Sequence, residues 1–151
     1  MSSYSSGETL LASVIRTVSG FTTANTTIGQ WGVLNSGASD HYAIIRKGQH
    51  TRAYNTPRMV ENTYRTIVEV WQRYKDDGNS YQSLLSYVDS IAETVDQYRK
   101  LSDNGGVVLD ATYIGSGDVI AQWRNKGDGP SWLRVDMTIE WKEQEITTYA
   151  E

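Results

Sequence analysis

Residues 132–141, WLRVDMTIEW, alternate between two sets of side chains. The apolar set consists of Leu133, Val135, Met137, Ile139 and Trp141. The other set carries both charge signs and consists of Trp132, Arg134, Asp136, Thr138 and Glu140. Because successive side chains of a strand point to opposite faces, this segment is predicted to be a strand with one face on a core and the other toward water or a partner. A sheet with a covered face therefore decides the fold.

Two other segments have the three- and four-residue apolar spacing of amphipathic helices. The first helix is predicted over residues 8–19, with Ser5 and Glu8 as a capping box and Gly20 as the stop. The second follows a turn at residues 76–79 and runs from Tyr81 for about six turns. Its apolar side consists of Leu84, Leu85, Val88, Ile91, Ala92, Val95 and Tyr98. Both helices are expected to lie across the sheet.

The remaining strands are predicted from β-rich runs between turn residues. Residues 41–48 are predicted to form a first strand, followed by a long polar connection over residues 49–57 that projects from the sheet. Residues 63–75 are predicted to form a central strand that pairs antiparallel with residues 42–46. Residues 107–114 and 118–125 are predicted to form a hairpin around residues 115–117.

The segment from residue 21 to residue 40 is rich in Thr, Ser, Asn and Gly, so we interpret it as a loop with a short extended piece. Trp31 is the expected anchor of this loop in the core.

These elements predict an α+β fold in which a single mixed, mostly antiparallel sheet carries two helices on one face. The 151 residues are expected to form one domain, with flexible ends at residues 1–5 and 146–151. A chain of this length buries about 70% of its unfolded surface, which is enough for a core without cross-links.

Composition excludes several classes of function. The chain has no cysteine, so it forms no disulfide, thiolate metal site or iron–sulfur cluster. The formal net charge of −4 argues against a protein whose main task is to grip a phosphate backbone. The first 20 residues lack a basic region and an unbroken apolar run, so we expect neither a signal peptide nor a membrane span.

Candidate catalytic and metal-binding groups are sparse. His41 and His50 are the only histidines, and they lack the spacing of a helical zinc pair. No Gly-x-Ser-x-Gly motif accompanies them, and residues 115–117 lack the third glycine and the Lys-Ser or Lys-Thr of a phosphate loop. Asp76 and Asp77 are explained by a turn. We therefore expect no enzyme, no cofactor and no metal.

Candidate contact residues form a basic and an acidic group. The basic group, Arg46, Lys47, Arg52 and Arg58, is interleaved with Tyr42 and Tyr54 around the predicted connection. Either nucleic acid or a protein partner could bind it, and a partner is favoured. The acidic group is expected at the opposite end of the molecule and consists of Asp136, Glu140, Glu143, Glu145 and Glu151. Such a subunit can associate head to tail and close into a ring, although an ordinary solvated strand end is the alternative.

The turn over residues 125–131 is a further candidate contact, with Lys126, Asp128 and the adjacent Trp132 as its expected interface residues. Trp and Tyr are enriched at protein interfaces because each joins an apolar body to a polar tip.

The order of these elements resembles the tail terminator and head-to-tail joining proteins of long-tailed bacteriophages. The similarity spans nearly the whole chain and is carried by GETLLASVIRTVSG (7–20), HYAIIRKG (41–48), TYRTIVEVWQRYKDD (63–77), SYQSLLSYVDSIAETVDQYRKL (80–101), VVLDATYI (107–114) and WLRVDMTIEW (132–141). It is a similarity of architecture, because the family has no short diagnostic motif.

The resemblance implies a structural protein of the virion tail or neck, assembled in the host cytoplasm. Its partners would be other copies of itself in a hexameric ring, the tail tube protein and a head connector or head-completion protein. DNA would pass through the ring as cargo, and a neutral to acidic wall would not retain it.

The alternative is a carbohydrate- or small-ligand-binding module. The chain has five Trp and ten Tyr, whose flat faces could stack on sugars.

Overall fold

The structure is a computed structural model that describes residues 4–57, 59–75, 77–97, 100–102, 108–123 and 130–146. The elements in chain order are α1 (Tyr4–Ile15), β1 (Thr26–Ile28), the short 3-10 helix η1 (Trp31–Asn35), β2 (His41–Thr56), β3 (Met59–Arg73), α2 (Asp77–Gln97), β4 (Lys100–Ser102), β5 (Val108–Ser116), β6 (Ile120–Trp123) and β7 (Pro130–Ile146).

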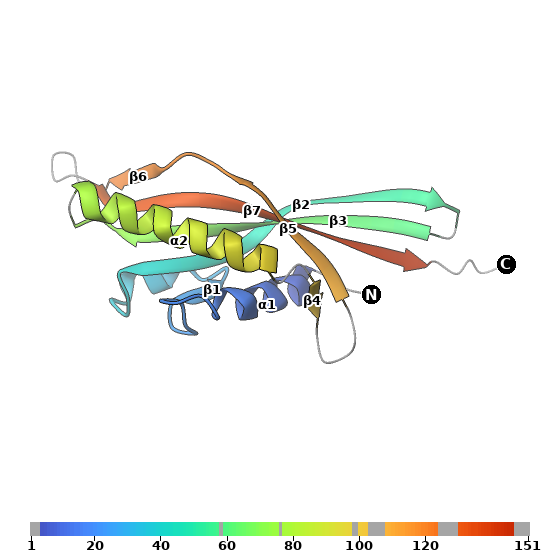
Figure 1. The fold of residues 1–151 in the computed structure, drawn as a ribbon, viewed down its shortest axis with the longest axis horizontal. Helices are drawn as coiled ribbons and strands as arrows, with labels where there is room; N and C mark the ends of the chain where they lie inside the picture. Colours follow the sequence, from blue (N-terminus) through green and yellow to red (C-terminus); the bar gives the residue numbers. More distant parts are fainter. Residues whose placement is uncertain are drawn as a thin grey trace.

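One sheet organises these elements. Its strand order is β1-β2-β3-β7-β5-β4, with β6 also paired to β7. The β1–β2 pair is parallel and all other pairs are antiparallel. Both helices cover the same face (Figure 1), which confirms the predicted α+β fold with two helices on one face of a mixed, mostly antiparallel sheet.

The main core lies between the helices and the sheet. All five apolar side chains of residues 132–141 are at most 7% exposed, which confirms the predicted strand. The helices contribute Leu11 and Ile15 from α1 and Leu84, Val88, Ile91 and Val95 from α2. The central position of β3 and its antiparallel pairing with residues 41–47 of β2 are likewise confirmed.

A second, smaller cluster covers part of the opposite face. Tyr42, Ile44 and Trp71 are buried there under Val33 and Leu34 of η1, with Trp132 packed beside them. Trp31 is 43% exposed, so the prediction that it anchors the loop in the core was wrong. Its neighbours in η1 supply the apolar contact instead.

The outer half of β2 corrects the predicted connection. Residues 49–56 are not a loop, because β2 continues to Thr56, which pairs with Met59 at the start of β3. The ladder is interrupted between Lys47 and His50 by a bulge. Gly48 lies in it, where a Cβ atom would be 2.5 Å from the carbonyl oxygen of Arg65. This polar segment adopts the extended conformation of a strand because its backbone pairs with β3, and not because it buries apolar surface.

The predicted hairpin between residues 107–114 and 118–125 was also wrong. β5 pairs with β7 from Asp110 to Ser116, and β6 pairs with β7 from Ile120 onward. The two strands are therefore consecutive segments along one side of β7. Residues 117–119 separate the two strands, and a register shift precedes Gly115, which adopts a positive φ of 144° that favours glycine.

Helix boundaries differ from the predicted ones at both ends of α1. The helix begins at Tyr4, so Ser5 lies inside it and cannot act as the N-cap, and it ends at Ile15. Gly20 has the positive φ, 94°, expected of a chain reversal. It does not end the helix directly, because residues 16–19 form turns between Ile15 and Gly20. α2 begins at Asp77, four residues before Tyr81. Of the predicted flexible ends, residues 4, 5 and 146 belong to elements, and the rest lie outside the described residues.

Candidate functional site

Three strands extend past both helices at one end of the molecule (Figure 1). We call this part the β arm; it consists of residues 47–56 of β2, 59–66 of β3 and 139–146 of β7. Its register is continuous across the three strands. Arg52 pairs with Asn62, which pairs with Glu143, and Tyr54 pairs with Val60, which pairs with Glu145.

The helix side of the β arm is held by stacked aromatic rings. The His50 and Tyr64 ring centroids are 4.5 Å apart at an interplanar angle of 7°, and those of Tyr64 and Trp141 are 5.6 Å apart at 22°. Gly7 of α1 lies against Trp141, since a Cβ at that glycine would be 2.2 Å from the indole. The base of the arm is therefore fixed to the helix layer.

Thr66, Asn62 and Val60 are separated by even numbers of residues along β3, so they lie on one face of the sheet. Their cross-strand partners therefore lie on that face as well; these are Lys47, Arg52 and Tyr54. The Arg52 guanidinium carbon is 5.9 Å from the Tyr54 ring centroid.

The other face of the β arm carries hydroxyls and cross-strand ion pairs. Arg65 Nε is 3.2 Å from Glu140 Oε2, and Lys142 Nζ is 4.0 Å from Glu61 Oε1. A shallow cavity of about 240 Å³ between β2 and β3 is lined by Gln49, Thr51, Thr63 and Arg65. Because each cation faces an anion on the neighbouring strand, the charge of this face is balanced locally.

Both outer strands of the β arm lack a neighbouring strand over part of their length. β1 pairs only with residues 43–45 of β2, so within the described residues no strand lies beside the outer half of β2. On the other side β5 reaches Lys142, and within the described ranges no strand flanks residues 143–146 of β7.

The two edge strands have opposite charge. Residues 47–56 contain Lys47 and Arg52 and no acidic residue, whereas residues 143–146 contain Glu143 and Glu145 and no basic residue. Glu143 and Glu145 were expected at the end of the molecule opposite the basic group. The antiparallel pairing of β3 with both neighbours instead places the two groups on opposite edges of one arm.

The other candidate contacts have different surroundings. Arg46 points away from the arm's basic edge, because its Nε is 2.5 Å from Glu69 Oε2 and its guanidinium is 3.5 Å from Asp136. Trp132 lies half-buried with its ring centroid 5.9 Å from that of Tyr42 and 4.6 Å from the Arg73 guanidinium. Arg58, Lys126, Asp128 and Glu151 lie outside the described residues.

Glu69 is a site residue that the sequence did not reveal. Its carboxylate is 4% exposed and accepts hydrogen bonds from Trp31 Nε1 at 2.8 Å and Trp71 Nε1 at 3.1 Å as well as from Arg46. This cluster fixes η1 to the face opposite the helices. A charged residue in a strand ordinarily indicates a solvent-facing position, so no local signal distinguishes it.

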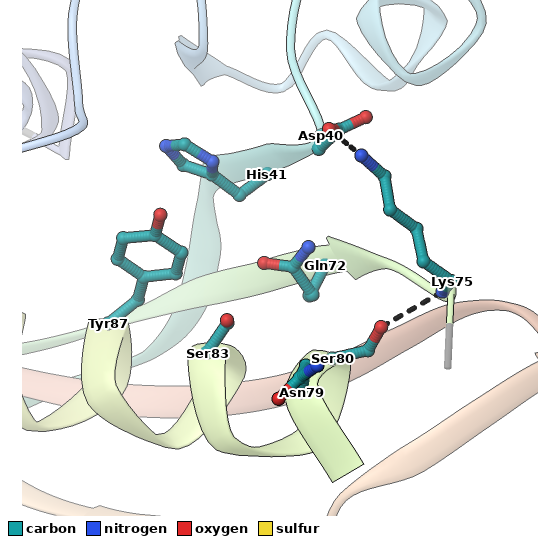
Figure 2. A pocket seen from close by; sticks show the side chains of 8 residues that line it. All are labelled: Asp40, His41, Gln72, Lys75, Asn79, Ser80, Ser83 and Tyr87. Atoms are coloured by element: carbon teal, nitrogen blue, oxygen red, sulfur yellow. Dashed lines mark hydrogen bonds and ion pairs between the residues drawn. The ribbon is translucent and has the colours of Figure 1, made fainter. Parts of the chain in front are cut away.

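A polar pocket lies at the end of the sheet where β2 begins and β3 ends. It has a volume of about 360 Å³ and is lined by Asp40, His41, Gln72, Lys75, Asn79, Ser80, Ser83 and Tyr87 (Figure 2). The His41 and Tyr87 rings stack at 4.3 Å on one side, and Asp40 is 2.5 Å from Lys75 Nζ on the other. The hydrogen bond from Lys75 lowers the pKa of Asp40.

Gln72 lies between these two pairs. Its side-chain nitrogen donates to the carbonyl oxygen of Arg73 at 3.2 Å. Its buried oxygen, Oε1, accepts no hydrogen bond from any described residue.

Within the described ranges, no group of three or more His, Cys, Asp or Glu side chains could hold a metal ion, and neither helix combines the length and apolarity needed to span a bilayer. Comparison with known proteins matched no family model and no curated protein.

Proposed function

We propose that this protein is a ring-forming structural subunit of a phage tail terminator or neck, which caps the tail tube and joins it to the head connector. The observation that carries the proposal is the β arm, with a basic strand at one edge and an acidic strand at the other. A surface of this kind is complementary to another copy of itself, with the basic edge of one copy facing the acidic edge of the next.

Contacts between two different surfaces of the same chain are heterologous, and they close into a ring when the rotation between copies allows it. The two complementary surfaces lie on opposite sides of one flat element, so each added copy continues the sheet in the same direction. A hexamer is the expected closure from the architectural resemblance.

The locally balanced face of the β arm supports the passage of DNA. A lumen wall of hydroxyls and paired charges, such as Arg65 with Glu140, attracts phosphates less than an open cluster of Lys and Arg would. Tail tube and connector would bind the two rims of the ring.

The test is the solution mass by light scattering together with negative-stain imaging of the protein mixed with purified tail tubes. Closed rings, or a cap at one end of each tube, are the expected result. A monomer at all concentrations that leaves tube ends bare would contradict the proposal.

The second candidate function, a small-ligand-binding module, is favoured by the unpaired Gln72 Oε1 in the polar pocket. Stacking on Trp faces is less favoured, since Trp71 and Trp141 are 7% and 0% exposed. Calorimetric titration with a panel of sugars and polyols tests it. Binding that is lost in Gln72→Leu and kept in the exposed helix variant Glu93→Ala would support the module, and no heat across the panel would contradict it.

A further inference from the structure

We infer that neighbouring copies join by strand pairing, with residues 143–146 of β7 in one copy beside residues 50–54 of β2 in the next. The inference rests on the proposed function, because it names the contact through which the ring would form. The occupant of each open strand edge is thus a second copy of this chain.

The two edge segments match in length. β2 and β3 pair without interruption from His50 to Tyr54, between the bulge at Lys47 and the irregularity at Tyr54. β7 extends four residues beyond its last pair with β5, at Lys142. A four- to five-residue ladder between them would continue the sheet across edges that no described strand covers.

The direction of the new pair follows from the topology. β2 and β7 are each antiparallel to β3, so they run parallel to one another within one β arm. A rotation about an axis near the strand direction keeps that direction, so β7 of one copy and β2 of the next also run parallel. The joint is therefore expected to be a parallel pair in an otherwise antiparallel wall.

Charge distinguishes this joint from the two symmetric alternatives. Pairing β2 with β2 would bring Lys47 and Arg52 of both copies to one seam, and pairing β7 with β7 would do the same for Glu143 and Glu145. Like charges on adjacent strands destabilise a sheet, whereas opposite charges stabilise it. The backbone register also places Arg52 and Glu143 in one row of the arm, each paired with Asn62.

The helices fix which face of the wall is inside. They cover one face of the sheet, and a closed ring accommodates that thicker layer on its outside, where there is more room (Figure 1). The face with Thr51, Thr63 and the Arg65–Glu140 pair then lines the lumen. Three strands from each of six copies would give a barrel of about 18 strands, a size that leaves an aqueous channel.

Disulfide trapping tests the joint, because the chain has no native cysteine. Two double variants combine Gln144→Cys with either Thr51→Cys or Ala53→Cys. By backbone register Ala53 and Gln144 both pair with Glu61, and Thr51 pairs with Thr63. A disulfide forms when the Cα atoms are about 4.4–6.8 Å apart. The matched control combines Gln144→Cys with Asp89→Cys on the exposed side of α2. Circular dichroism of each reduced variant establishes that it is folded.

Mild oxidation of either double variant is expected to convert most of the monomer into a ladder of covalent multimers that ends at the ring size. The control is expected to form no ladder on a denaturing gel, and Gln144→Cys by itself to yield no species beyond a dimer. Rings seen by light scattering without a ladder from either double variant would overturn the strand joint and leave the proposed function standing. Folded variants that form neither rings nor ladders would overturn both.

Discussion

Replacing Glu69 by Ala removes the acceptor that holds η1 and two tryptophans to the sheet. Trp71 is 7% exposed, so its indole N–H would be left buried without its partner at 3.1 Å, at a cost of about 1–3 kcal/mol. The Arg46 side chain is 36% exposed and keeps Asp136 at 3.5 Å, so its loss is smaller, about 1 kcal/mol. Trp31 is 43% exposed and can donate to water instead.

The expected sum is about 3 kcal/mol of unfolding free energy. For a chain of this length 1 kcal/mol corresponds to about 2–4 °C, so the melting temperature is expected to fall by about 6–12 °C. Thermal unfolding followed by circular dichroism measures it. Glu69→Gln keeps one acceptor oxygen, so its melting temperature should lie between those of Glu69→Ala and the parent. The exposed Glu93→Ala should melt within about 2 °C of the parent. A Glu69→Ala variant that melts with this control would refute the account of the buried carboxylate.

Three further predictions concern the β arm and α1. Arg52→Glu is expected to weaken ring formation in light scattering, with circular dichroism establishing that the variant is folded; adding Glu143→Arg should restore assembly, and a double variant as weak as the single would contradict the charge-matched joint. Gly48→Ala forces a Cβ to within 2.5 Å of the Arg65 carbonyl oxygen, so we expect a loss of about 1–3 kcal/mol in denaturant unfolding, and an unchanged midpoint would show that the bulge is not required. Burial raises the pKa of Glu8, so the charged form costs stability above the unfolded pKa of about 4.3; Glu8→Gln should therefore raise the melting temperature at pH 7 and not at pH 3.5, and equal gains at both values would contradict this.

The elements that can be predicted from the sequence are those in which buried side chains recur at a regular spacing. β7 alternates apolar and polar residues, and α2 repeats Leu84, Val88, Ile91 and Val95 along one side, because each packs one face on the same core. Local periodicity is sufficient to identify such elements.

The outer half of β2 has no such pattern, because its residues are mostly exposed on both faces and are extended by pairing with β3. Pairing with a distant strand also explains why the hairpin predicted between β5 and β6 was wrong. A Gly-Ser-Gly sequence is compatible with a hairpin turn or with a break in one strand, and only the distant partner β7 decides between them.

The candidate site was predicted in part. The β arm contains residues from two distant parts of the chain on the two strands that flank β3: Lys47, Arg52, Tyr54, Glu143 and Glu145. Their separation in the chain does not reveal this arrangement. Glu69 was missed because one of its partners, Trp31, is 38 residues away and belongs to a segment without regular periodicity. Contacts of this kind depend on the fold and leave no trace in local spacing.

The most direct test of the account is the mass of the purified protein in solution, measured by light scattering over a range of concentrations and followed by negative-stain imaging with tail tubes. For a ring-forming subunit, we expect a discrete closed oligomer, or a ring that appears at one end of each tube. A protein that stays monomeric throughout and leaves every tube end uncapped would contradict it.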